Sequence, residues 1–314
     1  MSLPLGNVRS IVTHDSCPDG TASALILKDA LDVPVRFIQY GSEDHKNLTP
    51  EPGMLFCDIT PTADRAKEFV EAGAIVLDHH KTARAVVEQF GENGVFADEA
   101  SEPGVCGAVL AFRHVWHPLL GQDFEAHSRF SFVKAFATLA GVRDTWQKQN
   151  PLWEEACTQA GVLHFIPNEH WLKLGLRSLA TNWGRDYEWL GKLLRDKQDS
   201  DTARLASKSR LFTTQAGTRV AVIPSKNTSD VAEMLGGKVD LLVGFGYTFE
   251  EGAEAPILIL STRSHSTFNC ASFCRAFGGG GHTRAAGCSF SVTSEMLNPY
   301  TFVESLIKKW EEGV

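Results

Sequence analysis

The chain has 314 residues, a length that favours two domains over one. Its composition, with 43% hydrophobic and 22% charged residues, is ordinary for a globular protein, and no apolar run approaches the ~18–20 residues that would span a bilayer. The net charge of −8 lies in residues 1–199, which carry 27 acidic and 19 basic side chains, whereas residues 200–314 carry 11 of each. This balance argues against tracking along a long nucleic acid and permits a small phosphate compound, provided that bound cations supply positive charge.

Seven cysteines are scattered along the chain without a Cys-x-x-Cys pair, although Cys270 and Cys274 lie four residues apart. An odd and scattered set is typical of a reduced protein rather than a disulfide scaffold. The first residues also lack the basic and apolar stretches of a secretion signal. We therefore expect a cytoplasmic protein that does not associate with membranes.

Strands and helices are predicted to alternate over the first hundred residues. Apolar runs predict strands at residues 8–14, 34–41, 54–60 and 74–79, and helical spacing of apolar residues predicts helices at 21–31, 63–72 and 82–90. Because these strands are almost continuously apolar, the expected fold class is α/β, with a parallel sheet covered on both faces.

The rest of the chain divides into three predicted segments. Residues 104–195 are expected to be helical, with tryptophans that pack in the core, and to complete a first domain over residues 1–195. The polar residues 196–215 suit a linker or a connecting helix. Strands reappear from Arg219, so residues 216–314 are predicted to form a second, smaller α/β domain.

Side chains that can bind metal ions follow three of the predicted strands. His14 ends the first strand and leads to Asp19, Asp58 lies near the end of the third, and Asp78-His79-His80 ends the fourth. Ligands of parallel sheets bind beyond the carboxyl ends of the strands, so we expect these side chains to meet at one edge. Neighbouring side chains on a strand face opposite ways, so the two histidines can have different roles.

Each motif alone has an ordinary structural explanation. Asp58 could cap a helix, although Thr60 is available for that task. Asp19 could also be a cap, but Pro18 and Gly20 favour a tight turn that directs it inward. Asp144 follows an apolar helix in the segment Arg-Asp-Thr-Trp, where an exposed helix end is about equally plausible.

Taken together, the motifs resemble those of the DHH phosphoesterase superfamily over the whole chain. Proteins of that family carry, in order, a motif after the first strand, an isolated Asp, the Asp-His-His triplet and a later Asp, which correspond here to His14…Asp19, Asp58, Asp78-His79-His80 and Asp144. The forms His-x-x-Cys-Pro-Asp-Gly and Arg-Asp-x-Trp are similar to those of one subgroup. The glycine run 278–281, followed by His282 and Ala-Ala-Gly, resembles the associated DHHA1 substrate-binding domain.

The resemblance implies a hydrolase with two divalent cations per chain, Mn²⁺ first, with Mg²⁺ or another divalent ion as the alternative. It implies that Asp58 bridges the cations, that His14 and Asp19 complete one site, and that Asp78, His79 and Asp144 form the other. Such a pair of cations activates a water molecule for attack on the phosphate. The expected catalytic residues are Asp78 and His80, and His80 would contact the phosphate or protonate the leaving group.

The first motif departs from the family pattern. Many members carry Asp-x-Asp there, which gives one ligand to each cation, whereas this chain has Cys17 two residues before Asp19 and Thr21 two residues after it. Either Asp15 or Cys17 could take the missing place, or a water molecule could fill it. The departure also keeps open a different class of function, a nucleotide sensor without catalytic activity.

The glycine run suits phosphate binding. Gly279, Gly280 and Gly281 can bring backbone N–H groups close to a phosphate, and His282 and Arg284 follow as donors. A second candidate is Arg263, at the end of a predicted strand. The alternative for the glycine run is a flexible loop without a binding role. If both domains take part, a cleft would have cations on one wall and these substrate-binding residues on the other.

The expected substrates are very short RNA or dinucleotides, cleaved by an exonuclease-like phosphodiesterase. The alternatives are a nucleotide monoesterase acting on 3′-phosphoadenosine 5′-phosphate (pAp) and a phosphodiesterase acting on cyclic dinucleotides or on short single-stranded DNA. A homodimer is possible.

Overall fold

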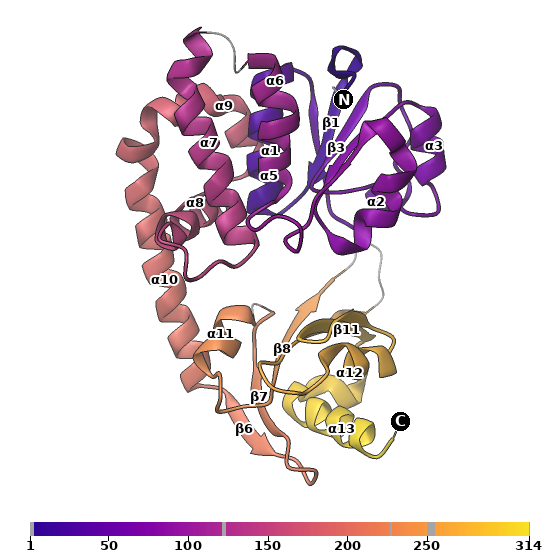
Figure 1. Cartoon of the computed structure of the whole chain (residues 1–314). Coiled ribbons are helices and arrows are strands. Elements are labelled where there is room, and N and C mark those ends of the chain that lie inside the picture. Colours follow the sequence, from indigo (N-terminus) through magenta and orange to yellow (C-terminus); the bar gives the residue numbers. More distant parts are fainter. Residues whose placement is uncertain (1–2, 121–123, 227, 250–254, 314) are drawn as a thin grey trace. The chain divides into compact units, whose positions relative to one another are not determined.

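The computed structural model describes residues 3–120, 124–226, 228–249 and 255–313 of the chain (Figure 1). They form two compact units, Met1–Arg195 and Asp196–Val314. In the described residues no helix is both long and apolar enough to cross a membrane.

A five-stranded parallel sheet organises the first unit and confirms the predicted α/β fold. Its strand order is β2-β1-β3-β4-β5, and every neighbouring pair is parallel. The strands are β1 Ser10–His14, β2 Val35–Ile38, β3 Met54–Cys57, β4 Ile75–Asp78 and β5 Gly94–Phe96. The helices among them are α1 Pro18–Leu31, α2 Glu43–Lys46, α3 Ala66–Glu71 and α4 Arg84–Val87.

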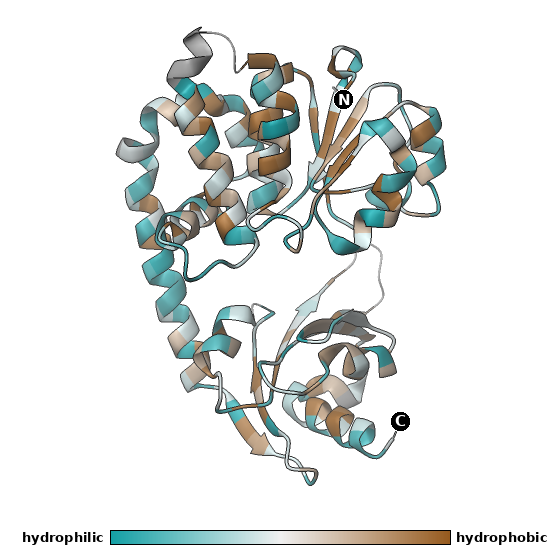
Figure 2. Cartoon of the chain, in the orientation of Figure 1, coloured by the Kyte–Doolittle hydropathy of each residue, from teal (hydrophilic) through white to brown (hydrophobic). Residues whose placement is uncertain are grey.

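Both faces of this sheet are buried, which explains why its strands are apolar throughout. Alternate residues such as Leu55 and Leu77 belong to one core cluster, which includes residues of α1, while Phe56 and Val76 belong to a second cluster with Phe69 of α3. Figure 2 shows hydrophobic residues along the strands and on helices that flank them. Because side chains alternate between the faces, residues that end a strand are also directed to opposite sides.

Helices make up the rest of the first unit. They are α5 Gly107–Ala111, a π-helical turn at Phe112–Trp116, α6 His117–Leu120, α7 Phe124–Asp144, α8 Trp153–Phe165, α9 Asn168–Asn182, a second π-helical turn at Trp183–Tyr187, and α10 Glu188–Ser207. Trp116 and Trp171 are fully buried in the core, as expected, whereas Trp189 is mostly exposed.

The second unit is built on a mixed six-stranded sheet in the order β10-β11-β9-β8-β7-β6. Only β7 and β8 pair in parallel among these strands. The elements are β6 Arg210–Thr213, β7 Arg219–Ile223, α11 Ser229–Met234, β8 Leu241–Thr248, β9 Ile257–Arg263, α12 Cys270–Ala276, β10 Gly280–His282, β11 Ala285–Ser291 and α13 Pro299–Glu311. Cys270 and Cys274 are buried on α12.

Two local predictions differ in part from the structure. The segment 196–215, predicted as a linker or a connecting helix, contains the end of helix α10 and also strand β6, so its last residues belong to the second sheet. Asp19 lies in the first turn of α1 rather than in a tight turn before it. Pro18 explains the difference, because its fixed φ and missing N–H suit the first position of a helix.

Candidate metal centre

The carboxyl ends of three neighbouring strands place the predicted side chains together. His14 ends β1, Asp58 follows β3 directly, and Asp78 ends β4 with His79 next in the chain. Since β1, β3 and β4 are adjacent and parallel, these ends lie at one edge of the sheet.

Asp19 is buried and held by a helix that is distant in sequence. Its two carboxylate oxygens accept hydrogen bonds from the backbone N–H groups of Gly107 (2.7 Å) and Ala108 (2.8 Å), at the start of α5. The residue before α5, Cys106, makes no side-chain cap, so Asp19 satisfies these N–H groups from outside the helix. This contact fixes the carboxylate against the sheet edge.

Gly107 is a site residue that the sequence analysis missed. A Cβ atom at this position would lie 2.6 Å from Cβ of Asp58 and 3.0 Å from a carboxylate oxygen of Asp19. Only glycine therefore lets α5 approach both acids. The available sequence signal was a glycine that precedes an apolar helix without a Ser, Thr, Asp or Asn cap.

Asp58 is buried and has an unusual backbone. Its φ is +63°, in the left-handed region that Asp adopts more readily than most residues, so its carboxylate turns away from the path of β3. Oδ1 lies 3.2 Å from Nε2 of His79, and Oδ2 lies 3.8 Å from Nδ1 of His14. Burial, followed by the charge of Asp19, raises the pKa of Asp58 well above its usual range.

His79 joins three carboxylates. Its Nε2 atom lies 3.2 Å from Asp58, 3.6 Å from Asp144 and 3.7 Å from Asp19. Asp144 comes from the end of α7, so this one nitrogen collects acids from three separate parts of the chain. The side chain of Asp144 is 28% exposed, yet desolvation of its carboxylate, followed by the charge of Asp19, raises its pKa to about 6.

Asp78 does not share a cluster of donor atoms with His79. It is directed to the face of Val76, as strand alternation requires, and its Oδ1 accepts hydrogen bonds from the backbone N–H (2.7 Å) and Nδ1 (2.9 Å) of His80. Among the described residues, Asp19 rather than Asp78 has its ligand atom close to those of His79 and Asp144. Coordination by Asp78 together with His79 and Asp144 stays a prediction.

The described residues form three groups of three donors, each with ligand atoms within 4.8 Å of one another. The groups are His14, Cys17 and Asp58; Asp58, His79 and His80; and Asp19, His79 and Asp144. Asp58 belongs to two groups and His79 to two, so the groups form one continuous cluster.

Within the first loop, Cys17 lies in the cluster and Asp15 does not. The Asp15 carboxylate accepts a hydrogen bond from Nδ2 of Asn168 (3.0 Å), whose Oδ1 accepts one from Thr21 (2.7 Å). Asn168, which sequence reasoning also missed, therefore ties the loop to the start of α9. Burial, followed by the charge of Asp58, raises the pKa of Cys17, so its thiol is protonated without a metal ion.

The cluster suits divalent cations. Among the described residues, Oδ2 of Asp58 is one of the buried side-chain oxygens that lack a hydrogen-bond partner, and a cation would compensate it. Burial, followed by His80, lowers the pKa of His14, so its ring is neutral and able to coordinate at neutral pH. Carboxylates with imidazoles are donors for ions such as Mn²⁺ and Zn²⁺.

Comparisons with solved structures agree with this architecture, whereas no protein-family model and no curated protein sequence matches the chain. A pGpG-specific phosphodiesterase, PggH from Vibrio cholerae, is 12% identical with a TM-score of 0.53, and the alignment covers 96% of this chain and 99% of PggH. The DHH domain of a member of the S1p family of ribosomal proteins is 13% identical with a TM-score of 0.54, over 97% of this chain and 86% of that one. The chain therefore shares its fold with these two proteins.

RecJ from Thermus thermophilus, solved with Mn²⁺, is similar over part of its length. It is 16% identical with a TM-score of 0.50, and the alignment covers 96% of this chain but 52% of RecJ. The likeness therefore concerns the two units described here and not the remainder of RecJ.

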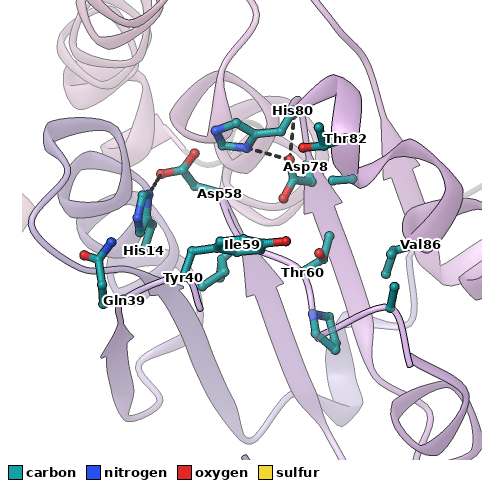
Figure 3. A pocket seen from close by; sticks show the side chains of 13 residues that line it. His14, Gln39, Tyr40, Asp58, Ile59, Thr60, Asp78, His80, Thr82 and Val86 are labelled. Carbon is teal, nitrogen blue, oxygen red and sulfur yellow. Dashed lines mark hydrogen bonds and ion pairs between the residues drawn. The ribbon is translucent and has the colours of Figure 1, made fainter. Parts of the chain in front are cut away.

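Two cavities in the first unit border the cluster. One, of about 370 Å³, contacts His14, Asp58, Asp78 and His80 (Figure 3). The other, of about 240 Å³, contacts Asp19 and Asp144 together with Arg143 and Trp146. The guanidinium of Arg143 lies 4.2 Å from the centre of the Trp146 ring. The donor cluster thus borders two separate cavities.

The glycine run of the second unit has a structural role at three of its four positions. Gly278 and Gly281 have φ of +78° and +136°, and a Cβ atom on Gly279 would lie 2.2 Å from the carbonyl oxygen of Gly287. Gly280 has open space around it. The tight hairpin of β10 and β11 therefore explains glycine at three of these positions without a bound ligand.

The basic candidates of this unit differ in their environment. His282 and Arg284 are exposed at the hairpin that joins β10 and β11. Arg263 is half-buried, and its guanidinium donates to Ser229 Oγ (3.2 Å) and to the carbonyl oxygen of Thr262 (2.9 Å). Arg263 is thus partly engaged within its own unit, whereas the hairpin residues face solvent.

Proposed function

We propose that the chain is a divalent-metal-dependent phosphodiesterase that hydrolyses short oligonucleotides or dinucleotides. One observation carries the proposal: the shared donors Asp58 and His79 join acids and imidazoles from distant segments into a single cluster. A buried group of like charges is costly for folding, and cations that bind there offset the cost.

Two cation sites follow from the grouping of donors. His14, Cys17 and Asp58 would hold one cation, and Asp19, His79 and Asp144 would hold the second, with Asp58 able to reach both through its two oxygens. When bound, a pair of divalent cations lowers the pKa of water and neutralises phosphate charge. Mn²⁺ is the proposed ion, with Mg²⁺ or another divalent ion as the alternative.

The chain's own residues have distinct tasks in this proposal. Asp19 is oriented by two backbone N–H groups of α5. Asp78 orients His80 by binding its Nδ1, which leaves Nε2 for the substrate. His80 is 45% exposed in its side chain and lies at the larger cavity, so it is placed to donate a proton to the leaving oxygen or to contact the phosphate.

A small nucleotide substrate is supported by charge and by size. The chain is acidic overall, and the larger cavity, about 370 Å³, falls in the size range of small-ligand sites. PggH, whose fold is similar, is described as pGpG-specific. Binding of the substrate's terminal phosphate by Gly280, His282 and Arg284 remains part of the proposal.

The test combines substrate length with one matched pair of variants. Wild-type protein with Mn²⁺ is incubated with 5′-labelled RNAs of two to twenty-four nucleotides, with pAp and with cyclic dinucleotides, and products are separated by length. Turnover should be fastest on the shortest linear substrates and should be lost in Asp58→Asn. Asp32→Asn, at an exposed Asp that also has positive φ, should keep full activity. Preferred turnover of pAp or cyclic dinucleotides would reassign the substrate, and binding without turnover would favour a sensor.

A further inference from the structure

The larger cavity of the first unit has a wall that the metal centre does not explain. Beyond His14, Asp58, Asp78 and His80 it is lined by apolar side chains and by Gln39, Tyr40, Thr60 and Thr82 (Figure 3). None of the described residues that line it is a Lys or Arg. This part of the cavity is therefore suited to an uncharged group rather than to a second phosphate.

Tyr40 is the largest ring in this wall and is 64% exposed. An exposed aromatic ring next to a reaction centre offers a flat surface for stacking, at little cost in conformational entropy. Figure 3 shows Tyr40 extending across the cavity between His14 and Thr60.

A buried histidine positions this ring. His45 lies with its ring centre 4.9 Å from that of Tyr40. Its Nδ1 accepts a hydrogen bond from the backbone N–H of Gly41 (3.1 Å), so its Nε2 must carry the proton that it donates to the carbonyl oxygen of Thr60 (2.7 Å). His45 therefore fixes both the segment that carries Tyr40 and the segment that follows Asp58.

We propose that Tyr40 is a specificity residue that stacks on the nucleobase of one of the two nucleosides flanking the scissile phosphate. Gln39, next to it, presents an amide donor and acceptor for the edge of the same base. The inference rests on the proposed function, because the metal centre must hold the phosphate that this nucleoside carries. Aromatic ring, amide, hydroxyls and an apolar wall together match a nucleobase, whereas a sugar or phosphate would need more charged and polar partners.

The test compares intact dinucleotides with dinucleotides that lack one base. kcat/KM is measured with Mn²⁺ for a linear dinucleotide and for two abasic analogues, one at each position. The proteins are wild type, Tyr40→Ala, Tyr40→Phe and Phe165→Ala. Phe165, an aromatic residue of similar exposure that does not line the cavity, serves as the control.

Wild type should disfavour one of the abasic analogues by about five- to a hundredfold, the range expected for one stacked base. Tyr40→Ala should lower kcat/KM for the intact substrate by a similar factor and leave turnover of that analogue unchanged, while Tyr40→Phe and Phe165→Ala behave as wild type. If Tyr40→Ala still disfavours the abasic analogue as strongly as wild type does, the stacking role of Tyr40 is wrong, and the proposed phosphodiesterase activity is unaffected. If wild type turns over no substrate, or Asp58→Asn remains active, both proposals fail.

Discussion

The carboxylate of Asp78 holds His80 by two hydrogen bonds to the same oxygen, from the backbone N–H at 2.7 Å and from Nδ1 at 2.9 Å. Burial lowers the pKa of His80, but the hydrogen bond and charge of Asp78 outweigh burial, so the pKa is raised overall. The pair thus orients the ring and keeps more of it protonated near neutral pH.

The first prediction concerns this pair. Asp78→Asn removes the charge that raises the pKa of His80, so the pKa should fall. If protonated His80 is the general acid, activity declines as pH rises through this pKa, and the alkaline limb should move to lower pH in the variant. The pH dependence of kcat with saturating Mn²⁺ measures the shift. An alkaline limb in the same place as in Asp32→Asn would argue against the role of the pair.

The second prediction concerns Cys17, the one sulfur donor of the three groups among the described residues. Thiolates favour Zn²⁺ over Mn²⁺ and Mg²⁺, whereas carboxylates suit the harder ions. Cys17→Asp should therefore tighten Mn²⁺ and Mg²⁺ binding by about tenfold and weaken Zn²⁺ binding. Titration calorimetry with each ion gives the order. The control is Cys17→Ser, which removes the sulfur without adding a charge. It should weaken binding of all three ions.

The third prediction uses the raised pKa of Asp144. A pKa of about 6 in the folded protein lies above the ~3.9 of an unfolded Asp, so its contribution to stability is present below pH ~3.9 and lost as pH rises through about 6. In metal-free protein at pH 7.5, Asp144→Asn should raise the melting temperature by a few degrees, and the difference should shrink toward pH 4. Thermal melts with a chelator measure it.

Asp240 serves as a control whose substitution should change the melting temperature in the opposite direction. Its hydrogen bonds with Arg219 lower its pKa to about 2, so its contribution is present above pH ~3.9 and lost on acidification. Asp240→Asn should lower the melting temperature at pH 7.5. If Asp144→Asn also lowers it in the absence of metal, the carboxylates of the cluster do not repel one another as described.

The fourth prediction separates structural from binding roles in the glycine run. Gly279→Ala should destabilise the second unit, because the added Cβ meets the carbonyl oxygen of Gly287. Gly280→Ala meets nothing within the chain and should leave the melting temperature unchanged. If this loop binds a substrate phosphate, KM should still rise by about tenfold in Gly280→Ala. An unchanged KM would remove Gly280 from the binding site.

The sequence was sufficient for the α/β fold and for the set of residues at the sheet edge. Apolar strands that end in Asp and His are visible as a pattern, because an apolar run and the polar residues that end it are local features of the sequence. The sequence did not predict which donor residues group together in each candidate cation site. Asp78 and His79 are neighbours in sequence, but strand alternation directs them to opposite faces, and the positive φ of Asp58 turns its side chain toward His79.

Contacts between distant segments account for the residues that were missed. Gly107 matters because α5 packs against Asp19 and Asp58, and Asn168 matters because α9 reaches the first loop. Nothing in the local sequence of either residue specifies these partners, since tertiary packing selects them.

The central claim is that Asp58 is shared by two cation sites, and paramagnetic resonance of the Mn²⁺-loaded protein tests it most directly. Two Mn²⁺ ions joined through one carboxylate are magnetically coupled, so wild type should bind two ions per chain and give a coupled spectrum that disappears in Asp58→Asn. A spectrum of isolated Mn²⁺ with one ion per chain, unchanged in that variant, would contradict the account.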